Sequence, residues 1–180
     1  MVVIIVEGES DREFLEDFTR TLNIPREKIE FKVFEGKDNI FKRDHPFYDE
    51  IENELEIING LLITTDADDP KDPPPIRGYD ATQKALETLI DDLDFGIPID
   101  YYIFCDTERK GYLESFLLSV LDDSQRQCVE DFKSCYQYDL TDKLVFNTFY
   151  KQKQHPFDYE HPNFNALKTK LNNLFEGTLS

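Results

Sequence analysis

Four acidic side chains follow the ends of two apolar segments. Glu7 directly follows the N-terminal apolar run, and Asp11 comes four residues later. Asp66 and Asp68 directly follow a second apolar run, and alternation along an extended chain predicts that both lie on one side. If the two runs are neighbouring strands, Glu7 converges with the aspartate pair. Like charges about 4 Å apart repel by roughly 4 kcal/mol at an effective dielectric of 20, so such a cluster requires a counter-ion.

The residue types favour a hard divalent cation as that counter-ion. Carboxylate oxygens without histidine or cysteine favour Mg²⁺ or Mn²⁺, and Mg²⁺ keeps water molecules for substrate phosphates. The chain has three cysteines and three histidines, and the cysteines form no Cys-x-x-Cys pair. We therefore expect neither a zinc site nor a disulfide framework. We expect a Mg²⁺ (or Mn²⁺) site whose ligands are Glu7, Asp11, Asp66 and Asp68.

Each of these acids also has a purely structural interpretation. Asp11 stands near the start of a predicted helix, where a negative charge stabilises the macrodipole. The Asp-Ala-Asp-Asp-Pro segment that begins at Asp66 is common in loops. Ser10 and Glu13 form a capping-box pattern, which we interpret as a helix cap. Glu7 is harder to explain structurally, because a carboxylate at the end of a buried strand costs stability unless it is paired.

The elements that must position these side chains alternate between strand and helix. Continuous β-branched runs are typical of strands buried on both faces of a parallel sheet, and segments with apolar residues at helical spacing separate them. Strands are expected at residues 2–6, 29–34, 61–65 and 101–105. Helices are expected at about residues 10–22, 48–57, 79–93, 113–121, 125–136, 142–150 and 163–175. This order predicts an α/β fold with ligands at the carboxyl ends of its strands.

Length and composition are typical of one compact globular domain. We assign that domain to residues 1–180, with a core at about 1–120 and a helical C-terminal extension at about 121–180. No apolar stretch reaches the roughly 18 residues needed to span a bilayer. Glu7 interrupts the N-terminal run before a signal-peptide core could form. We therefore expect a cytoplasmic protein without membrane contact.

Net charge restricts the partners that the surface can accept. The chain has 38 acidic and 20 basic residues, a net charge of −18. A surface of this sign repels nucleic-acid phosphates, although salt screens the repulsion beyond about 8 Å under physiological conditions. A nucleic acid is therefore disfavoured as a partner unless a bound cation, a local basic patch or a partner protein offsets the repulsion.

The two acidic motifs resemble those of a known superfamily. The segment Val-Ile-Ile-Val-Glu-Gly-Glu-Ser-Asp at residues 3–11, with Asp66-Ala-Asp68 after a second apolar strand, is similar to the Toprim domain. This domain is shared by topoisomerases, bacterial primases, small ribosomal-RNA maturases and OLD-family (overcoming lysogenization defect) nucleases. The resemblance implies a Rossmann-like, mostly parallel four-stranded sheet flanked by helices. It also implies Glu7 as a general acid or base or a metal ligand, and Asp66 and Asp68 as ligands of Mg²⁺.

The similarity is greatest to the OLD-family nucleases and to small single-domain Toprim-like bacterial proteins, over residues 1 to about 150. It implies roles for Asp11 as a second early acid and for Gly36 after the second strand. It further implies roles for Glu114, an acid on a later helix, and for Lys143, a lysine near the C-terminus.

Other features depart from these relatives. Position 71 is a lysine, where many Toprim domains have the glycine of Asp-x-Asp-x-x-Gly. The chain also lacks the length for the tyrosine-bearing domain of a topoisomerase and the cysteines for the zinc module of a primase. OLD nucleases carry an ATPase domain, but the chain contains no Gly-x-x-x-x-Gly-Lys-Ser/Thr motif. Any ATPase partner would therefore be a separate chain.

Together these features lead to a hypothesis of metal-dependent phosphodiester hydrolysis acting on DNA or RNA. In it the four acids hold the ion, and Glu7 also acts in catalysis. Glu114 completes a second metal position, and Lys143 stabilises negative charge in the transition state. Two alternatives stay open. One is a noncatalytic Toprim-like metal-binding or regulatory module acting through a partner protein, and the other is an acidic docking protein without a metal site.

Overall fold

The chain folds around one sheet of four parallel strands. The computed structural model describes residues 1–72, 76–135, 140–149 and 157–176. The strand order is β2-β1-β3-β4, and every pairing in it is parallel. The strands are β1 (Val2–Val6), β2 (Ile29–Val33), β3 (Gly60–Asp66) and β4 (Ile99–Phe104). The predicted Rossmann-like α/β class with a four-stranded parallel sheet is confirmed.

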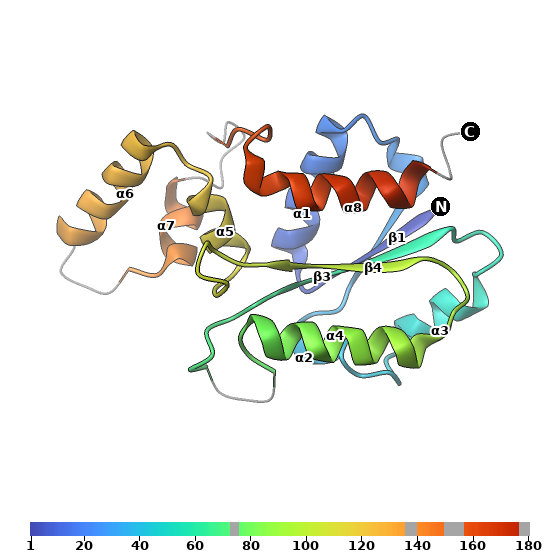
Figure 1. Cartoon of the computed structure of the whole chain (residues 1–180). Helices are drawn as coiled ribbons and strands as arrows, with labels where there is room; N and C mark the ends of the chain where they lie inside the picture. Colours follow the sequence, from blue (N-terminus) through green and yellow to red (C-terminus); the bar gives the residue numbers. More distant parts are fainter. Residues whose placement is uncertain (73–75, 136–139, 150–156, 177–180) are drawn as a thin grey trace.

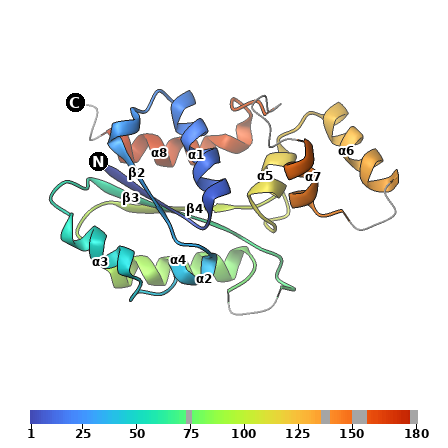
Figure 2. The same ribbon diagram turned by 180° about the vertical axis from the view of Figure 1, so that it is seen from behind.

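Helices cover both faces of the sheet and one of its ends (Figure 1). One face carries α1 (Glu9–Thr21) and α8 (Asn165–Glu176), and the other carries α2 (Lys37–Ile40), α3 (Pro46–Asn53) and α4 (Tyr79–Leu93). Beyond the carboxyl ends of the strands lie α5 (Leu113–Ser119), α6 (Asp123–Cys135) and α7 (Asp142–Phe149), grouped together in both views (Figures 1 and 2). Short 3-10 turns, η1 (Arg26–Lys28) and η2 (Pro162–Phe164), precede β2 and α8.

Strand β1 supplies the centre of the core on both faces of the sheet. All five of its side chains are fully buried. Val2, Ile4 and Val6 join a hydrophobic cluster with residues of α1, α5 and α8, while Val3 and Ile5 join a second cluster with residues of α3 and α4. Because both faces are covered, polar chemistry is restricted to the end of the strand.

The start of α1 differs from the predicted cap. The helix begins at Glu9, and its N-cap is Gly8. The carboxylate of Asp11 accepts a hydrogen bond from Gly8 N at 2.9 Å (Oδ2). The prediction that Ser10 and Glu13 cap this helix is therefore wrong. Asp11 satisfies the exposed N–H at the helix start in their place.

Two other regions differ from expectation. The single helix expected at about residues 48–57 is replaced by the short α2 and by α3, which begins at Pro46 because a proline ring suits the first helical turn. The predicted C-terminal extension includes α8, which lies against the sheet with Leu167 and Leu171 fully buried in its core. None of the described helices is both long enough and apolar enough to span a membrane.

Candidate functional site

The pairing of β1 with β3 brings Glu7 to the end of β3. The register aligns Ile5 with Ile63, which places Glu7 level with Thr65. Glu7 Oε1 accepts a hydrogen bond from Asp66 N at 2.7 Å and another from Thr65 Oγ1. The predicted convergence of these two strand ends is confirmed.

Backbone N–H groups also orient Asp66 and Asp11. Leu113 N donates to Asp66 Oδ1 at 2.9 Å, and Gly8 N donates to Asp11 Oδ2 at the same distance. In the part of the chain that the structure describes, the second oxygen of Asp66 accepts no hydrogen bond. One oxygen of this carboxylate therefore fixes its orientation, and the other is available to a ligand.

Glu114 is a buried acid with no hydrogen-bond or ion-pair partner among the described residues. It is the second residue of α5, and it is 5% exposed. A buried ionisable group in this state costs several kcal/mol unless it is neutralised or given a cation.

These carboxyl groups influence one another electrostatically. Burial raises the pKa of Asp66 well above its usual value, and the charges of Glu7, Asp11 and Glu114 raise it further. Burial and the charge of Glu7 raise the pKa of Asp11 to about 7. Burial also raises the pKa of Glu7, against the lowering effect of its hydrogen bond from Thr65. We call Glu7, Asp11, Asp66 and Glu114 the acidic cluster.

Asp68 lies outside this cluster. Its Oδ2 is 2.8 Å from Lys37 Nζ and 3.6 Å from Arg77 Nε, whereas Asp66 contacts the start of α5 at Leu113. The expectation that Asp66 and Asp68 lie on one side is wrong. Asp68 has a φ of 63°, and this left-handed conformation ends the extended alternation.

Lys37 is a buried cation surrounded by oxygen atoms. It is 5% exposed, and its Nζ lies 2.6 Å from Asp66 O, 3.2 Å from Ala67 O, 2.8 Å from Asp68 Oδ2 and 2.8 Å from Thr82 Oγ1. The ammonium therefore connects α2 to the end of β3 and to α4. It also pairs with Asp68, and its charge opposes the rise in the pKa of Glu7, on which the charge of Asp68 acts too.

Sequence reasoning did not identify Lys37 or Arg77. The available signal is weak: each adjoins a glycine with a positive φ, Gly36 at 123° and Gly78 at 81°. Such glycines mark tight turns, here near the sheet edge where ligands bind. A basic residue next to such a turn is therefore a candidate site residue, but the local sequence does not show which acid it will pair with.

A short bridge between two loops places the start of α5. Asp68 N donates to Gly111 O at 2.8 Å, and Gly111 N donates to Asp68 O at 3.2 Å. Gly111 has a φ of 92°, and a Cβ there would lie 2.7 Å from Ser115 Oγ. Glycine tolerates this positive φ and has no Cβ to clash with Ser115. The turn at Gly111 therefore helps to place Leu113 and Glu114 at the acidic cluster.

A cavity of about 490 Å³ opens beside Glu7 at the carboxyl ends of the strands. We call it the polar cavity. Its charged lining residues are the basic Lys37, Lys42 and Arg77 and the acidic Glu7, Glu35, Asp38 and Asp68. It therefore combines one member of the acidic cluster with three cations.

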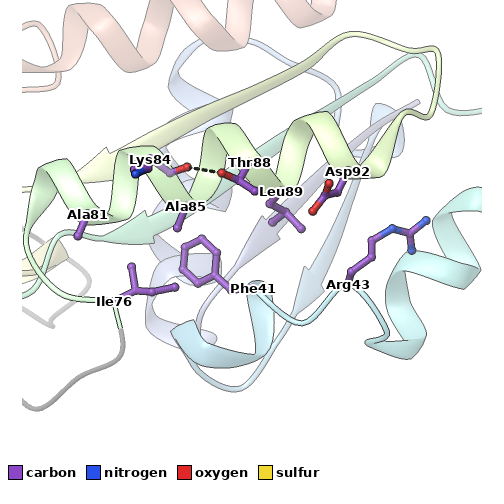
Figure 3. A pocket seen from close by; sticks show the side chains of 9 residues that line it. All are labelled: Phe41, Arg43, Ile76, Ala81, Lys84, Ala85, Thr88, Leu89 and Asp92. Carbon is purple, nitrogen blue, oxygen red and sulfur yellow. Dashed lines mark hydrogen bonds between the residues drawn. The ribbon is translucent and has the colours of Figure 1, made fainter.

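A second cavity, of about 420 Å³, lies between α4 and the segment after α2 (Figure 3). We call it the apolar cavity. The ring of Phe41 and the side chain of Ile76 line it, while the next residues, Lys42 and Arg77, line the polar cavity. Its acidic residue is Asp92 alone, so the carboxylate chemistry belongs to the polar cavity and the adjoining cluster.

Lys143 lies on α7 and is exposed. It is not among the residues that line the polar cavity. The catalytic role expected for it stays a prediction.

The donor chemistry of the acidic cluster suits Mg²⁺ or Mn²⁺. Its donors are hard carboxylate oxygens, they repel one another, and Glu114 has no other partner among the described residues. Within the same described residues, no three histidine, cysteine or acidic side chains are already grouped closely enough to hold an ion. Binding would therefore require these side chains to move closer together.

A protein-family model matches most of the chain. Residues 1–156 match the family described as Protein of unknown function (DUF3226). The chain belongs to the DUF3226 family. The part matched to DUF3226 includes the acidic cluster and the polar cavity, and it ends before α8. No match was found among curated proteins or solved structures.

We predict that Asp11→Asn stabilises the metal-free protein more at pH 8 than at pH 5. The folded pKa of Asp11 is raised from 3.8 to about 7, so its contribution to stability is present at low pH and is lost as pH rises through about 7. Asparagine removes this loss, which begins above the unfolded pKa of 3.8 and is complete above about pH 7. Since each pKa unit corresponds to about 1.4 kcal/mol, we expect a gain of about 1–3 kcal/mol near pH 8 and roughly a third of that near pH 5. Urea unfolding in a chelating buffer measures the difference. The control is Asp17→Asn on the same helix, and an equal effect of Asp11→Asn at both pH values would contradict the prediction.

We also predict that Lys37→Met destabilises the fold strongly. The substitution leaves the carboxylate of Asp68 without its closest cation, and breaking a buried ion pair in this way costs about 3–5 kcal/mol. The double variant Lys37→Met/Asp68→Asn should recover part of this loss because it removes the charge. Lys42→Met, an exposed neighbour, should change the free energy of unfolding by less than about 0.5 kcal/mol. Equal stabilities of Lys37→Met and Lys42→Met would show that the buried ammonium is not structural.

Proposed function

We propose that the chain hydrolyses phosphodiester bonds of DNA or RNA, with Mg²⁺ or Mn²⁺ bound at the acidic cluster. One observation carries the proposal: the carboxylate of Glu114 is 5% exposed and, within the described residues, has no hydrogen-bond or ion-pair partner. It lies near acids whose pKa values are raised by burial and by the charges of other members of the cluster. A divalent cation would relieve this repulsion at the edge of the sheet where α/β folds bind ligands.

The residues of the acidic cluster would bind the ion, and one of them would also transfer a proton. All four would supply oxygen ligands, and the backbone N–H groups that bind three of them would keep their orientation. A bound Mg²⁺ or Mn²⁺ would polarise the phosphoryl oxygen and lower the pKa of a water molecule. Glu7 lines the polar cavity as well, which suits it to move a proton to or from a substrate held there.

Asp68 has a different part in this proposal from the one its motif suggests. Its carboxylate is committed to Lys37 and Arg77. We therefore assign it the task of holding these cations at the cavity wall, and assign the ligand positions to the acidic cluster.

A noncatalytic metal-binding or regulatory module is the second candidate. It is favoured by the net charge of −18, which opposes nucleic-acid binding, and by the lack of a preassembled group of three ligands within the described residues. Such a module would bind the ion at the same residues and act through a protein partner, such as a separate ATPase.

We predict that purified protein cleaves single-stranded DNA or RNA oligonucleotides with Mn²⁺ or Mg²⁺, and that Asp66→Asn lowers the rate at least about 100-fold because a ligand is lost. Calorimetric titration should show Mn²⁺ binding to the wild type and its loss in the variant. The control is Asp92→Asn, an exposed acid of the apolar cavity, which should keep both properties.

The outcomes separate the two candidates. Mn²⁺ binding that Asp66→Asn removes, without cleavage by the wild type, would favour the regulatory module. Absence of any Mn²⁺ binding would reject both.

A further inference from the structure

The polar cavity contains two cations whose donors are only partly used. The side chain of Arg77 is 22% exposed, and its Nη1 donates to Ile76 O at 2.8 Å and to Asp38 Oδ1 at 3.3 Å. Lys42 Nζ donates to Asn39 Oδ1 at 2.8 Å. Within the described residues, Arg77 Nη2 donates no hydrogen bond. These groups can therefore bind an anion without breaking a buried interaction.

Four acids and three cations line the cavity, so its lining has no net positive charge. Asp68 is shared by Lys37 and Arg77, and Asp38 is paired with Arg77 at 3.3 Å. Glu35 and Asp38 are exposed, where water and salt weaken their attraction. A phosphate group bound here would therefore rely on the unused N–H groups of Arg77 and Lys42 rather than on an excess of positive charge.

Glu7 belongs to the acidic cluster and also lines the polar cavity. Its charge raises the pKa of both Asp11 and Asp66. A group bound at Arg77 would therefore be next to the carboxylates that hold the ion in the proposed function.

We propose that Arg77 and Lys42 form a subsite that binds a phosphate group of a nucleic-acid strand beside the acidic cluster. A guanidinium offers paired N–H groups that match the geometry of phosphate oxygens, and an ammonium adds a further point charge. The subsite gives a chain of net charge −18 directional donors through which it can contact a polyanion. This inference rests on the proposed function, because the phosphate would belong to the strand to be cleaved.

The test measures binding without turnover. Full-length protein in a chelating buffer is titrated into a fluorescein-labelled single-stranded DNA oligonucleotide, with anisotropy as the readout, at several salt concentrations. Arg77→Gln should weaken binding about tenfold, the loss expected for one charge-assisted contact. It should also reduce the slope of log K against log salt by about 0.7, the value for one phosphate contact on a single strand. Inorganic phosphate should compete with the oligonucleotide.

Two further variants keep the test decisive. Arg77→Lys, which keeps the charge, should recover part of the affinity and of the salt slope. Lys42→Gln, at an exposed position, should weaken binding in the same direction and serves as the test if Arg77→Gln does not fold. Arg43→Gln is the matched control, since Arg43 lines the apolar cavity (Figure 3) and should leave affinity and slope unchanged.

The subsite is rejected if wild type binds no oligonucleotide, or if Arg77→Gln and Lys42→Gln bind like Arg43→Gln with the same salt slope. Separate cleavage assays with Mn²⁺ show whether the proposed function also fails. Loss of affinity in Arg77→Gln together with no cleavage by wild type would support the subsite and reject the nuclease. Cleavage by wild type together with unchanged binding in Arg77→Gln would support the nuclease and reject the subsite.

Discussion

Repulsion among buried carboxylates at the end of the sheet is the constraint on which the site depends. The parallel pairing of β1 with β3 forces Glu7 against the last residue of β3, and the start of α5 adds Glu114. Burial and mutual charge raise the pKa values of Glu7, Asp11 and Asp66. A fold that keeps these acids together must therefore take up protons or a cation.

The fold relieves part of this repulsion with its own cation. Lys37 pairs with Asp68 and binds the backbone at the end of β3, and its charge also opposes the rise in the pKa of Glu7. The result is a site in two adjoining parts, the acidic cluster near α5 and the polar cavity with its three cations and four acids, and Glu7 belongs to both. This division suits a substrate that carries negative charge and is processed next to a bound cation.

Sequence predicted the elements whose signals are local. The β-branched run of β1 and the helical spacing of α4 gave their bounds correctly, and the shared edge of parallel strands predicted that Glu7 would meet Asp66. The role of Lys37 was missed because its partners lie 29 to 45 residues away, and no periodicity marks a buried lysine. The turn of Asp68 was missed because its positive φ is an exception to extended alternation. Long-range pairing and one backbone dihedral therefore decide which acids share a site.

The most direct measurement is a pH titration of the carboxyl carbons by NMR, with and without saturating Mg²⁺. Without the ion, we expect Asp11 to titrate near pH 7 and Asp66 to titrate well above its ordinary range. With Mg²⁺, both midpoints should fall below their ordinary values, because a bound cation stabilises the ionised form. Ordinary midpoints in the metal-free protein would show that burial and mutual repulsion do not shift these acids, and midpoints that Mg²⁺ does not move would show that these acids do not hold the ion.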